Sequence, residues 1–477
     1  MNASLSLFSF QLQKESAVPL YQQLAEQILA LAEGGALLPN EKLPPIRALA
    51  AHLGVNASTV VAAYRALEQK KAVYSRVGSG TFVSPIPREE LPKERQEMPE
   101  VLLRRPVMEA GAINFTDTSL PPSLFPTSAF QQAINQLLEE EKGAAFGKMD
   151  SQGYLPLRDV LCRFLADYGI LAHPENIQIL SGAQQGLDVV SKALLNFGDV
   201  IFVEKPTFPG AVGAFYSRGC RVVELEMEED GVHLGELENL AKLYRPRFFY
   251  TMAYFQTPTG ISYSQSKKKK LLDLAEKYDF YIIEDDNLYD FNYTSHPLVP
   301  FKAMDHRSRV IYLKSFSKIL MPGLRMGFAV FPRKLLSHMM RAKYTTDIAT
   351  SGFLQKALAR YLEENSWAAH IKTICAYGKD QYRLAVKYVD RYLSSAVTYQ
   401  KPQGGISLWL RPKGFSAEAW LMEAAQKQVY LSPGSQFALS KGEENALRLC
   451  FIHVPQAKME QGIRRLSQAL KESGLTP

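Results

Sequence analysis

Between residues 177 and 315 the chain alternates short, almost continuous apolar runs with longer stretches of helical character. Continuous apolar runs of this length are typical of strands that are buried on both faces of a sheet. Strands of that kind separated by helices favour a mostly parallel sheet covered by helices, which is an α/β fold. The runs are IQIL at 177–180, DVIFVE at 199–204, RFFYTM at 247–252, FYIIED at 280–285 and VIYLKS at 310–315.

A smaller unit with helical patterns precedes this region. Helices are predicted in PLYQQLAEQILALAEGGAL, where Gly34-Gly35 break the apolar stripe, and in IRALAAHLG, and Asn56 can cap a third helix. Gly54 can supply the left-handed turn between the second and third helices, and two helices joined in this way form a helix-turn-helix. Val60, Tyr64 and Leu67 form the predicted inward face of the third helix. The following VYSRVGSGTFV predicts a two-stranded wing.

A stretch rich in proline and in mixed charge separates the two regions. It reads SPIPREELPKERQEMPEVLLRRPVMEA, and its lack of aromatic residues favours a linker over a packed core. The alternative is a long surface helix that its prolines interrupt. A chain of 477 residues is too long for one ordinary core. We therefore predict a winged helix-turn-helix over 14–84, a linker over 85–111 and a large α/β domain over 112–474.

The first turn of the third helix carries short polar side chains, which suit a helix whose start approaches base edges in a DNA groove. Nearby arginines can meet phosphates, and glycine in the wing lets backbone N–H groups approach a strand. The DNA-binding candidates are Asn56, Ser58, Thr59, Arg47, Arg65 and Gly80. For any one of the polar residues alone, a cap or an ordinary surface position is the alternative.

This pattern resembles the winged helix of the GntR family. The family signature LPSxRxLAxxLGVSRxTVxxAYxxLxxxG is met here as LPPIRALAAHLGVNASTVVAAYRALEQKK, with GSGTFV in the wing. The resemblance implies double-stranded DNA as a partner, with contacts from Arg47, Ser58, Thr59 and Gly80. Three residues depart from the signature, namely Ala57 in place of an arginine, Pro45 in place of a capping serine and Lys71 in place of a glycine. The first 85 residues hold seven Lys or Arg against five Asp or Glu, so we expect two copies to bind each operator.

A second set of polar residues follows the strands of the predicted sheet. Lys318 has two hydroxyl residues and an arginine near it in the sequence, namely Ser315, Ser317 and Arg325. Gly182-Ala183-Gln184 opens a helix directly after a strand, and the N–H groups of such a turn bind anions. An amine and an anion site are therefore expected close together.

A carboxylate and an aromatic ring complete this set. Asp285 ends a strand at the carboxyl edge of the sheet, where ligands bind in open α/β folds. Phe208, in KPTFPG, can stack on a flat ring. Pyridoxal phosphate needs such a set, because it binds through a lysine, a phosphate site, a carboxylate facing its pyridine nitrogen and a flat contact for its ring.

In order and spacing these pieces resemble fold-type I aminotransferases of class I and II, over about residues 112–472. The motifs are SFSKILMPGLRMG, FGKMDSQGYLPLR, SGAQQGLD, EKPTFPG, QTPTG, IIEDD and LRLCF. The resemblance implies Lys318 as the catalytic lysine that bonds the cofactor, Asp285 on its pyridine nitrogen and Phe208 on its ring. It implies phosphate contacts from Ala183, Gln184, Ser315, Ser317 and Arg325. It also implies that Arg448 holds a substrate carboxylate, for which a surface ion pair is the alternative.

Two positions depart from the aminotransferase pattern, and both concern donors to the phenolic oxygen of the cofactor. Thr257 stands where the family often has asparagine. Leu288 stands where a tyrosine is usual, and Tyr289 follows one place later, so we predict Tyr289 as a cofactor contact from this shifted place. Loss of these donors would weaken the electronic tuning of the cofactor without abolishing its binding. Binding without fast turnover is what a sensor needs.

Both halves together resemble the MocR subfamily of GntR regulators across nearly the whole chain. The resemblance implies a homodimer whose aminotransferase-like body senses an amino compound and whose winged helices bind paired half-sites on DNA. Two other functions stay open, a working aminotransferase whose first unit only aids assembly, and a sensor of pyridoxal phosphate itself. The formal net charge of +7 permits a polyanionic partner without requiring one.

The remaining features predict a cytoplasmic protein without a metal site or a membrane partner. The first residues carry no basic segment ahead of their apolar ones, and no apolar run approaches the length of a membrane span. Four scattered cysteines without a CxxC pair favour buried reduced thiols over zinc ligands or disulfides. The run of lysines at 267–270 predicts a solvated helix face, with nucleic-acid contact as the alternative.

Overall fold

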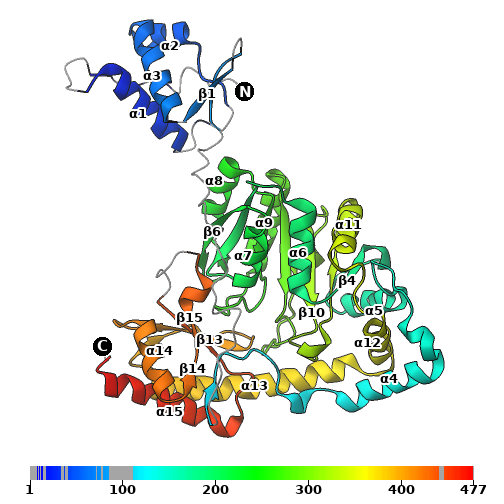
Figure 1. Cartoon of the computed structure of the whole chain (residues 1–477). Helices are drawn as coiled ribbons and strands as arrows, with labels where there is room; N and C mark the ends of the chain where they lie inside the picture. The colour runs from blue at the N-terminus through cyan, green and yellow to red at the C-terminus, as the bar shows by residue number, and fades with distance from the viewer. Residues whose placement is uncertain are drawn as a thin grey trace. The chain divides into compact units, whose positions relative to one another are not determined.

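A computed structural model of the chain describes residues 8, 10, 12–13, 18–33, 37, 41–70, 72–76, 79–84, 111–439 and 445–475. Contacts divide the chain into two compact units, Met1–Gln96 and Glu97–Pro477, each of which is described by itself (Figure 1). The linker predicted at 85–111 lies outside the described residues apart from Gly111. No single helix in the described ranges is long and apolar enough to cross a membrane, although the bent pair of helices 46–53 and 57–69 passes a test of length and composition.

In its described residues the first unit contains three helices followed by a hairpin. Its elements are α1 (Leu20–Glu33), α2 (Ile46–Leu53), α3 (Ala57–Gln69), β1 (Val73–Arg76) and β2 (Gly80–Val83). The direction of the chain changes by 117° between α2 and α3, within the range of a helix-turn-helix. The hairpin pairs Val73 with Val83 and Arg76 with Gly80, and this is the predicted wing. Gly78, predicted at its tip, and Lys71 lie outside the described residues.

Local signals in the sequence explain how the first unit forms. The side chain of Asn56 accepts a hydrogen bond from the Ser58 N–H at 3.1 Å and so caps α3, as predicted. Gly54 ends α2 in the left-handed region, with φ +64°. The predicted inward face of α3 is buried, and the hydroxyl of Tyr64 donates to the Pro44 carbonyl at 2.8 Å. These residues join Leu24 and Ile28 of α1 in one apolar core.

The second unit is built on one large sheet. Eight strands of its described part lie in the order β4-β11-β10-β9-β8-β5-β6-β7. They are β4 (Ile177–Leu180), β5 (Val200–Lys205), β6 (Arg221–Glu228), β7 (Gly231–Val232), β8 (Phe248–Thr251), β9 (Tyr281–Asp286), β10 (Val310–Ser315) and β11 (Gly327–Val330). The five apolar runs of the sequence form β4, β5, β8, β9 and β10, so the prediction of a mostly parallel sheet is confirmed.

Pairing fixes the direction of each strand. The pairs β10·β9, β9·β8, β8·β5 and β5·β6 are parallel. Strand β11 is antiparallel both to β10 and to β4, so β4 points the same way as the parallel strands. The segments that follow β4, β5, β8, β9 and β10 therefore begin at the same edge of the sheet, here called the carboxyl edge.

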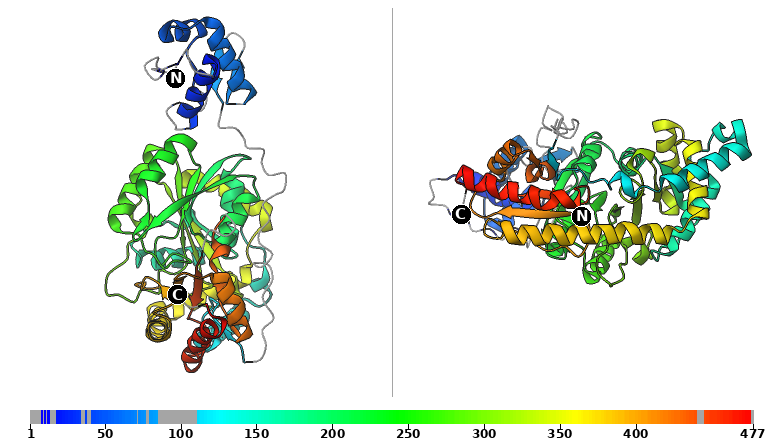
Figure 2. Two further views of the ribbon diagram at one scale, coloured as in Figure 1. Left: turned by 90° about the vertical axis from the view of Figure 1, so that its left-hand side faces the viewer. Right: turned by 90° about the horizontal axis from the view of Figure 1, so that it is seen from below.

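Helices cover both faces of the large sheet (Figures 1 and 2). Alternate residues along a strand reach different cores, since Phe248 and Tyr250 pack with α6 and α7, whereas Phe249 packs with α8 and α9. This two-sided burial explains why the strands are apolar throughout. The helices are α4 (Thr127–Glu141), α5 (Leu155–Ala166), α6 (Ala183–Leu194), α7 (Pro209–Tyr216), α8 (Leu234–Tyr244), α9 (Gln265–Lys277), α10 (Phe301–Met304), α11 (Leu336–Asp347) and α12 (Gly352–Glu364).

A smaller subdomain follows the large sheet. Its antiparallel sheet has the order β12-β13-β16-β15, and a separate parallel pair joins β3 to β14. The long helix α13 runs alongside α15 beneath this sheet (Figures 1 and 2). The elements are β3 (Ile113–Asn114), β12 (Val397–Thr398), β13 (Ser407–Pro412), β14 (Val429–Tyr430), β15 (Ser432–Pro433), β16 (Leu447–Cys450), α13 (Trp367–Tyr392), α14 (Ala417–Gln426) and α15 (Gln456–Ser473). Short 3-10 helices lie at 122–124, 142–146, 174–176, 322–324, 333–335 and 434–437.

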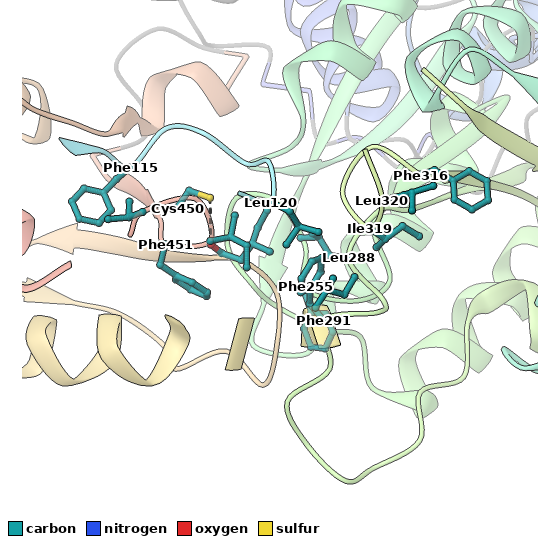
Figure 3. Packing of buried hydrophobic residues seen from close by; sticks show 14 of the residues in the cluster. Phe115, Leu120, Phe255, Leu288, Phe291, Phe316, Ile319, Leu320, Cys450 and Phe451 are labelled. Carbon is teal, nitrogen blue, oxygen red and sulfur yellow. Dashed lines mark hydrogen bonds between the residues drawn. The ribbon is translucent and has the colours of Figure 1, made fainter. Parts of the chain in front are cut away.

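One apolar cluster extends from the small subdomain to the loop that follows β10 (Figure 3). Figure 3 labels Phe316, Ile319 and Leu320 of that loop, Phe255, Leu288 and Phe291 from the loops after β8 and β9, and Phe115, Leu120, Cys450 and Phe451 beside the small sheet. The loop that carries Lys318 is therefore anchored by buried side chains on either side of the lysine.

The lysine run at the start of α9 differs from its prediction. Lys269 and Lys270 are exposed, as a solvated face requires, but Lys268 is fully buried. Its amine donates to the Tyr254 hydroxyl and, at 2.5 Å, to the Val299 carbonyl. Lys267 pairs with Asp230 at 2.8 Å. The prediction of a solvated face was wrong for these two lysines, because helical periodicity turns position 268 inward with Leu271 and Ala275.

Candidate cofactor site and DNA-binding face

The loop after β10 holds the predicted catalytic lysine at the carboxyl edge. The amine of Lys318 donates a hydrogen bond to the hydroxyl of Thr118. Burial lowers the pKa of Lys318 to about 8, and the charges of Arg448 and Arg325 act in the same direction. A neutral amine is the form that attacks a carbonyl group, so a lowered pKa prepares Lys318 for that reaction.

Arg325 and two serines form an anion cradle beside Lys318. The Arg325 guanidinium donates to the Ser317 hydroxyl at 3.1 Å and to the Ser181 carbonyl at 3.2 Å. The Ser315 hydroxyl donates to that of Ser317 at 3.0 Å. The structure thus brings together three of the residues predicted to contact a phosphate. Among the described residues no carboxylate pairs with Arg325, which leaves its charge available for an anion.

The start of α6 closes the cradle from the side of β4. Gly182 precedes the helix with φ +91°, and the first N–H groups of the helix, at Ala183 and Gln184, have no acceptor within it. A Cβ atom on Gly182 would lie 2.8 Å from the Arg325 guanidinium. The backbone at Gly182 and the Arg325 side chain therefore share a space that admits no side chain.

We expect Gly182→Ala to weaken cofactor binding by about 10-fold or more. The added methyl group requires a strained φ, which costs about 1–3 kcal/mol, and it displaces Arg325 from the cradle. Equilibrium titration of the cofactor-free full-length chain with pyridoxal phosphate measures the change. Gly323→Ala is the matched control, because it lies in the lysine loop with no atom within 4 Å of its added Cβ. Equal affinity of the two variants would contradict the cradle.

Asp285 lies at the end of β9, buried to 3% exposure. Its Oδ2 accepts a hydrogen bond from the Tyr250 hydroxyl at 2.8 Å, but its Oδ1 is buried and has no partner among the described residues. Burial raises the pKa of Asp285 to about 6, and the neighbouring Asp286 adds to the rise. A buried carboxylate oxygen without a donor is unfavourable, so this atom is suited to a cationic N–H group on a ligand.

Phe208 and Gln184 lie next to each other through Gly210. The Gln184 side-chain amide donates to the Gly210 carbonyl at 2.8 Å. A Cβ atom on Gly210 would lie 2.6 Å from both the Phe208 ring and the Gln184 side chain. Phe208, half-buried at the start of α7, is therefore placed beside the N-terminus of α6, as a ring contact for the same ligand requires.

Tyr289, predicted as a cofactor contact, has its hydroxyl bonded within the chain. Its hydroxyl donates to the Leu298 carbonyl at 3.0 Å, and its ring packs between those of Tyr168 and Tyr254. No contact within the described ranges joins it to Lys318 or Asp285. Leu288 takes the inward place before it and is buried in the core.

Arg448 extends from β16 toward the same site. One of its terminal nitrogens donates to the Ser432 hydroxyl at 3.0 Å and to the Thr116 carbonyl at 3.3 Å. Burial lowers the pKa of Arg448, and its Nε is buried without a partner among the described residues. No carboxylate pairs with it in that part of the chain, which contradicts the surface ion-pair alternative.

Sequence reasoning missed the segment that follows β3. Pairing of β3 with β14 brings Thr116 to Arg448 and Thr118 to Lys318. The Asp117 carboxylate accepts from the Ser119 N–H at 2.8 Å, and the charges of His453 and Lys318 help to lower its pKa. The sequence NFTDTSLPP has no periodic pattern, so only the pairing of β3 places it in the site.

In the first unit most of the predicted DNA contacts are exposed. Asn56, Ser58 and Arg65 on α3 and Arg47 on α2 are exposed, whereas Thr59 is half-buried. A shallow groove of about 520 Å³ lies along α3, lined by Tyr21, Ser58, Ala62, Arg65 and Gln69 among others. At the wing, the Lys42 side chain covers Gly80 so closely that an added Cβ would lie 2.8 Å from it. Lys42 is a basic residue at the wing that the motif did not indicate.

One molecule could meet the needs of the larger site at once. It would offer an aldehyde to Lys318, a phosphate to the Arg325 cradle and a protonated ring nitrogen to Asp285. Pyridoxal phosphate is such a molecule, so the second unit has the fold and the residues of a pyridoxal-phosphate-binding protein of the aminotransferase type.

Comparison with known proteins agrees. Residues 119–466 match the family described as aminotransferase class I and II, and residues 20–83 match the bacterial regulatory proteins of the gntR family. The chain belongs to the aminotransferase class I and II family and, through both domains together, to the MocR group of GntR-type regulators. Pyridoxal phosphate is the cofactor of this family.

Relatives cover either the whole chain or its larger domain. An uncharacterized HTH-type transcriptional regulator, YcxD of Bacillus subtilis, is 30% identical over 94% of this chain and 99% of its own length. The probable rhizopine catabolism regulatory protein MocR of Rhizobium meliloti is 28% identical over 98% of this chain and 97% of its own. The crystal structure of kynurenine aminotransferase from Pyrococcus horikoshii covers 76% of this chain and 92% of its own, with 31% identity and a TM-score of 0.72.

Proposed function

We propose that this protein is a transcriptional regulator that binds DNA as a homodimer and changes its affinity when an amino compound enters the pyridoxal phosphate site. The observation that carries the proposal is the joining in one chain of a complete winged helix and a complete lysine, phosphate and carboxylate set. Full-length relatives that are named as regulators support it. A regulator of this kind works in the cytoplasm, where the DNA is.

When bound, pyridoxal phosphate supplies an aldehyde that reacts with primary amines. Lys318 offers the neutral amine, Arg325 and the start of α6 hold the phosphate, and Asp285 keeps the ring nitrogen protonated. Arg448 holds the carboxylate of the incoming compound. In the presence of such a compound, Lys318 would be a free neutral amine and Arg448 would be paired with a carboxylate, so the contacts of both residues in the site would change.

The rival function is a working aminotransferase whose first unit only aids assembly. The aminotransferase function is disfavoured because the phenolic oxygen of the cofactor would have fewer donors. Thr257 and Leu288 replace the usual donors, and the Tyr289 hydroxyl already donates to the Leu298 carbonyl. Slow conversion of the cofactor to its amine form with common amino acids is therefore expected. Rapid multiple turnover with one amino acid would favour the enzyme.

Fluorescence anisotropy tests the proposal directly. The full-length chain is titrated onto labelled DNA from immediately upstream of its own gene, with pyridoxal phosphate present or removed and at fixed salt. Tighter binding than to scrambled DNA of the same composition is expected, with a further change when an active amino compound is added. A response to pyridoxal phosphate alone would make the cofactor itself the signal. No sequence preference in any of these states would count against a regulator.

The arginines of the winged helix give a second test. We expect Arg47→Ala and Arg65→Ala each to weaken binding to specific and scrambled DNA alike, because phosphate contacts carry no sequence information. For each lost contact, the slope of log affinity against log salt concentration falls in magnitude by about 0.9. Arg163→Ala, which removes an exposed arginine from the second unit, is the control of equal charge. Slopes unchanged from the wild type would remove these arginines from the DNA interface.

A further inference from the structure

Three buried polar atoms without partners among the described residues belong to residues that contact one phenylalanine of the small subdomain. They are the Nε of Arg448, the indole Nε1 of Trp409 and the hydroxyl oxygen of Thr207. Trp409 is 6% exposed and Thr207 is 1% exposed. None of these atoms has a hydrogen-bond partner in the part of the chain that the structure describes. Buried polar atoms almost always have a partner, so three in one place call for an explanation.

Phe437 links the three residues. The Trp409 ring packs edge-on against the Phe437 ring, with 5.8 Å between centroids, and the Arg448 guanidinium lies 5.0 Å above the same ring. The Thr207 N–H donates to the Phe437 carbonyl at 2.9 Å. Trp409 on β13 is directly opposite Arg448 on β16, so both side chains emerge on the same face of the sheet.

The chemistry of these atoms limits what can satisfy them. An indole N–H and a guanidinium Nε–H only donate hydrogen bonds, so both need an acceptor. The far side of the Arg448 guanidinium is already held by Ser432 and Thr116, which fixes its orientation. A carboxylate has two acceptor oxygens and a charge opposite to that of arginine. An amide or a hydroxyl would satisfy the hydrogen bonds but leave the buried charge of Arg448 without a counter-ion.

We propose that Trp409 is a second donor to the effector carboxylate that Arg448 binds, with one oxygen on each N–H group. The effector is therefore an amino acid or another amine that carries a carboxylate, and a simple amine lacks this contact. This inference rests on the proposed function, because it assigns a residue to the same effector site.

The test uses ligands that are anchored by the cofactor portion, so the side chain of the natural effector need not be known. N-(5′-phosphopyridoxyl)-L-alanine carries the carboxylate, and N-(5′-phosphopyridoxyl)-ethylamine lacks it. Titration calorimetry of the cofactor-free full-length chain gives the affinity for each. The wild type is expected to prefer the alanine conjugate. Trp409→Phe, which keeps a ring but removes the N–H, is expected to reduce that preference by about 10-fold or more, since hydrogen bonds to charged groups are the strong ones.

The ethylamine conjugate reports whether the variant remains folded, because its affinity should change by less than about twofold if Trp409 acts only on the carboxylate. Trp420→Phe is the matched control. It removes a buried indole N–H of the same subdomain, which donates to the Leu466 carbonyl, and should leave the preference intact. A Trp409→Phe variant that keeps the full preference, or loses affinity equally for both conjugates, would overturn the inference. Failure of the wild type to bind either conjugate would instead reject the proposed function.

If Trp409→Phe does not fold, a second measurement on the wild type still tests the inference. The chain has three tryptophans, so the wild type gives three indole N–H signals in a nitrogen-proton correlation spectrum. One signal should move downfield with the alanine conjugate and stay in place with the ethylamine conjugate. Three unmoved signals would contradict a hydrogen bond from Trp409.

Discussion

Replacement of Lys318 by alanine is expected to abolish the response of DNA binding to amino compounds while leaving DNA binding itself intact. The lysine amine is the group that an incoming amine must replace, and its lowered pKa of about 8 keeps part of it neutral near physiological pH. Without it the cofactor is held only by the cradle and Asp285, and its covalent absorption band disappears. Absorbance spectra and the anisotropy titration measure both effects in one sample.

Lys148→Ala controls for the loss of a lysine, since Lys148 is exposed and lies on the surface of the second unit. It should retain the absorption band and the full response. The proposed mechanism would be wrong if the DNA affinity of Lys318→Ala responded to the amino compound as that of the wild type does. Loss of DNA binding in the absence of effector would show instead that the lysine maintains the fold.

Asp285→Asn is expected to weaken cofactor binding by about 100-fold to 4000-fold. The variant keeps the shape of the side chain but leaves a cationic ring nitrogen buried opposite a neutral amide, and removal of one partner of a buried pair costs about 3–5 kcal/mol. The unpartnered Oδ1 of Asp285 is the atom whose contact is lost. Titration with pyridoxal phosphate measures the change, and Asp273→Asn, an exposed carboxylate on α9, is the control. Affinity within about threefold of the wild type would mean that Asp285 does not face the ring nitrogen.

For the same variant we expect the stability of the cofactor-free protein to depend differently on pH. Burial raises the pKa of Asp285 from 3.8 to about 6, so the folded chain binds more protons than the unfolded chain between these values. The stability that this group contributes is present below its unfolded pKa and is lost as the pH rises through about 6. Asparagine does not titrate. The free energy of unfolding of Asp285→Asn should therefore rise relative to that of the wild type from about pH 4 to about pH 7, as urea denaturation would show.

Much of the fold and part of the site were predictable because the signals are local. A strand that is buried on both faces must be apolar throughout, so β5, β9 and β10 could be placed by composition alone. Asn56 caps α3 through a hydrogen bond within three residues. The lysine loop places Ser317 and Arg325 within eight residues of each other, and they contact in the structure.

The rest depends on residues that are distant in the chain. Thr118 and Lys318 are 200 positions apart, and only the pairing of β3 with β14 joins them. The helical period of α9 places position 268 on the inward face, but the acceptors that satisfy the buried Lys268 amine, Tyr254 and Val299, are not indicated by that pattern. The importance of Trp409 appears only in three dimensions, because an indole in a strand is ordinary until its N–H is found without a partner.

The attachment of β3 has a mechanical consequence. The segment that emerges from residues 85–110 is bound at once to the small subdomain, since the Ile113 N–H donates to Gln428 and the Phe115 N–H to Tyr430. The Phe115 carbonyl accepts from the Cys450 N–H at 2.8 Å, two residues from Arg448. Two of these backbone bonds thus hold residues 113–115 against β14, and the third joins Phe115 to β16, the strand that carries Arg448. A displacement of β16 would therefore act on Phe115 directly, without a relay through the large sheet.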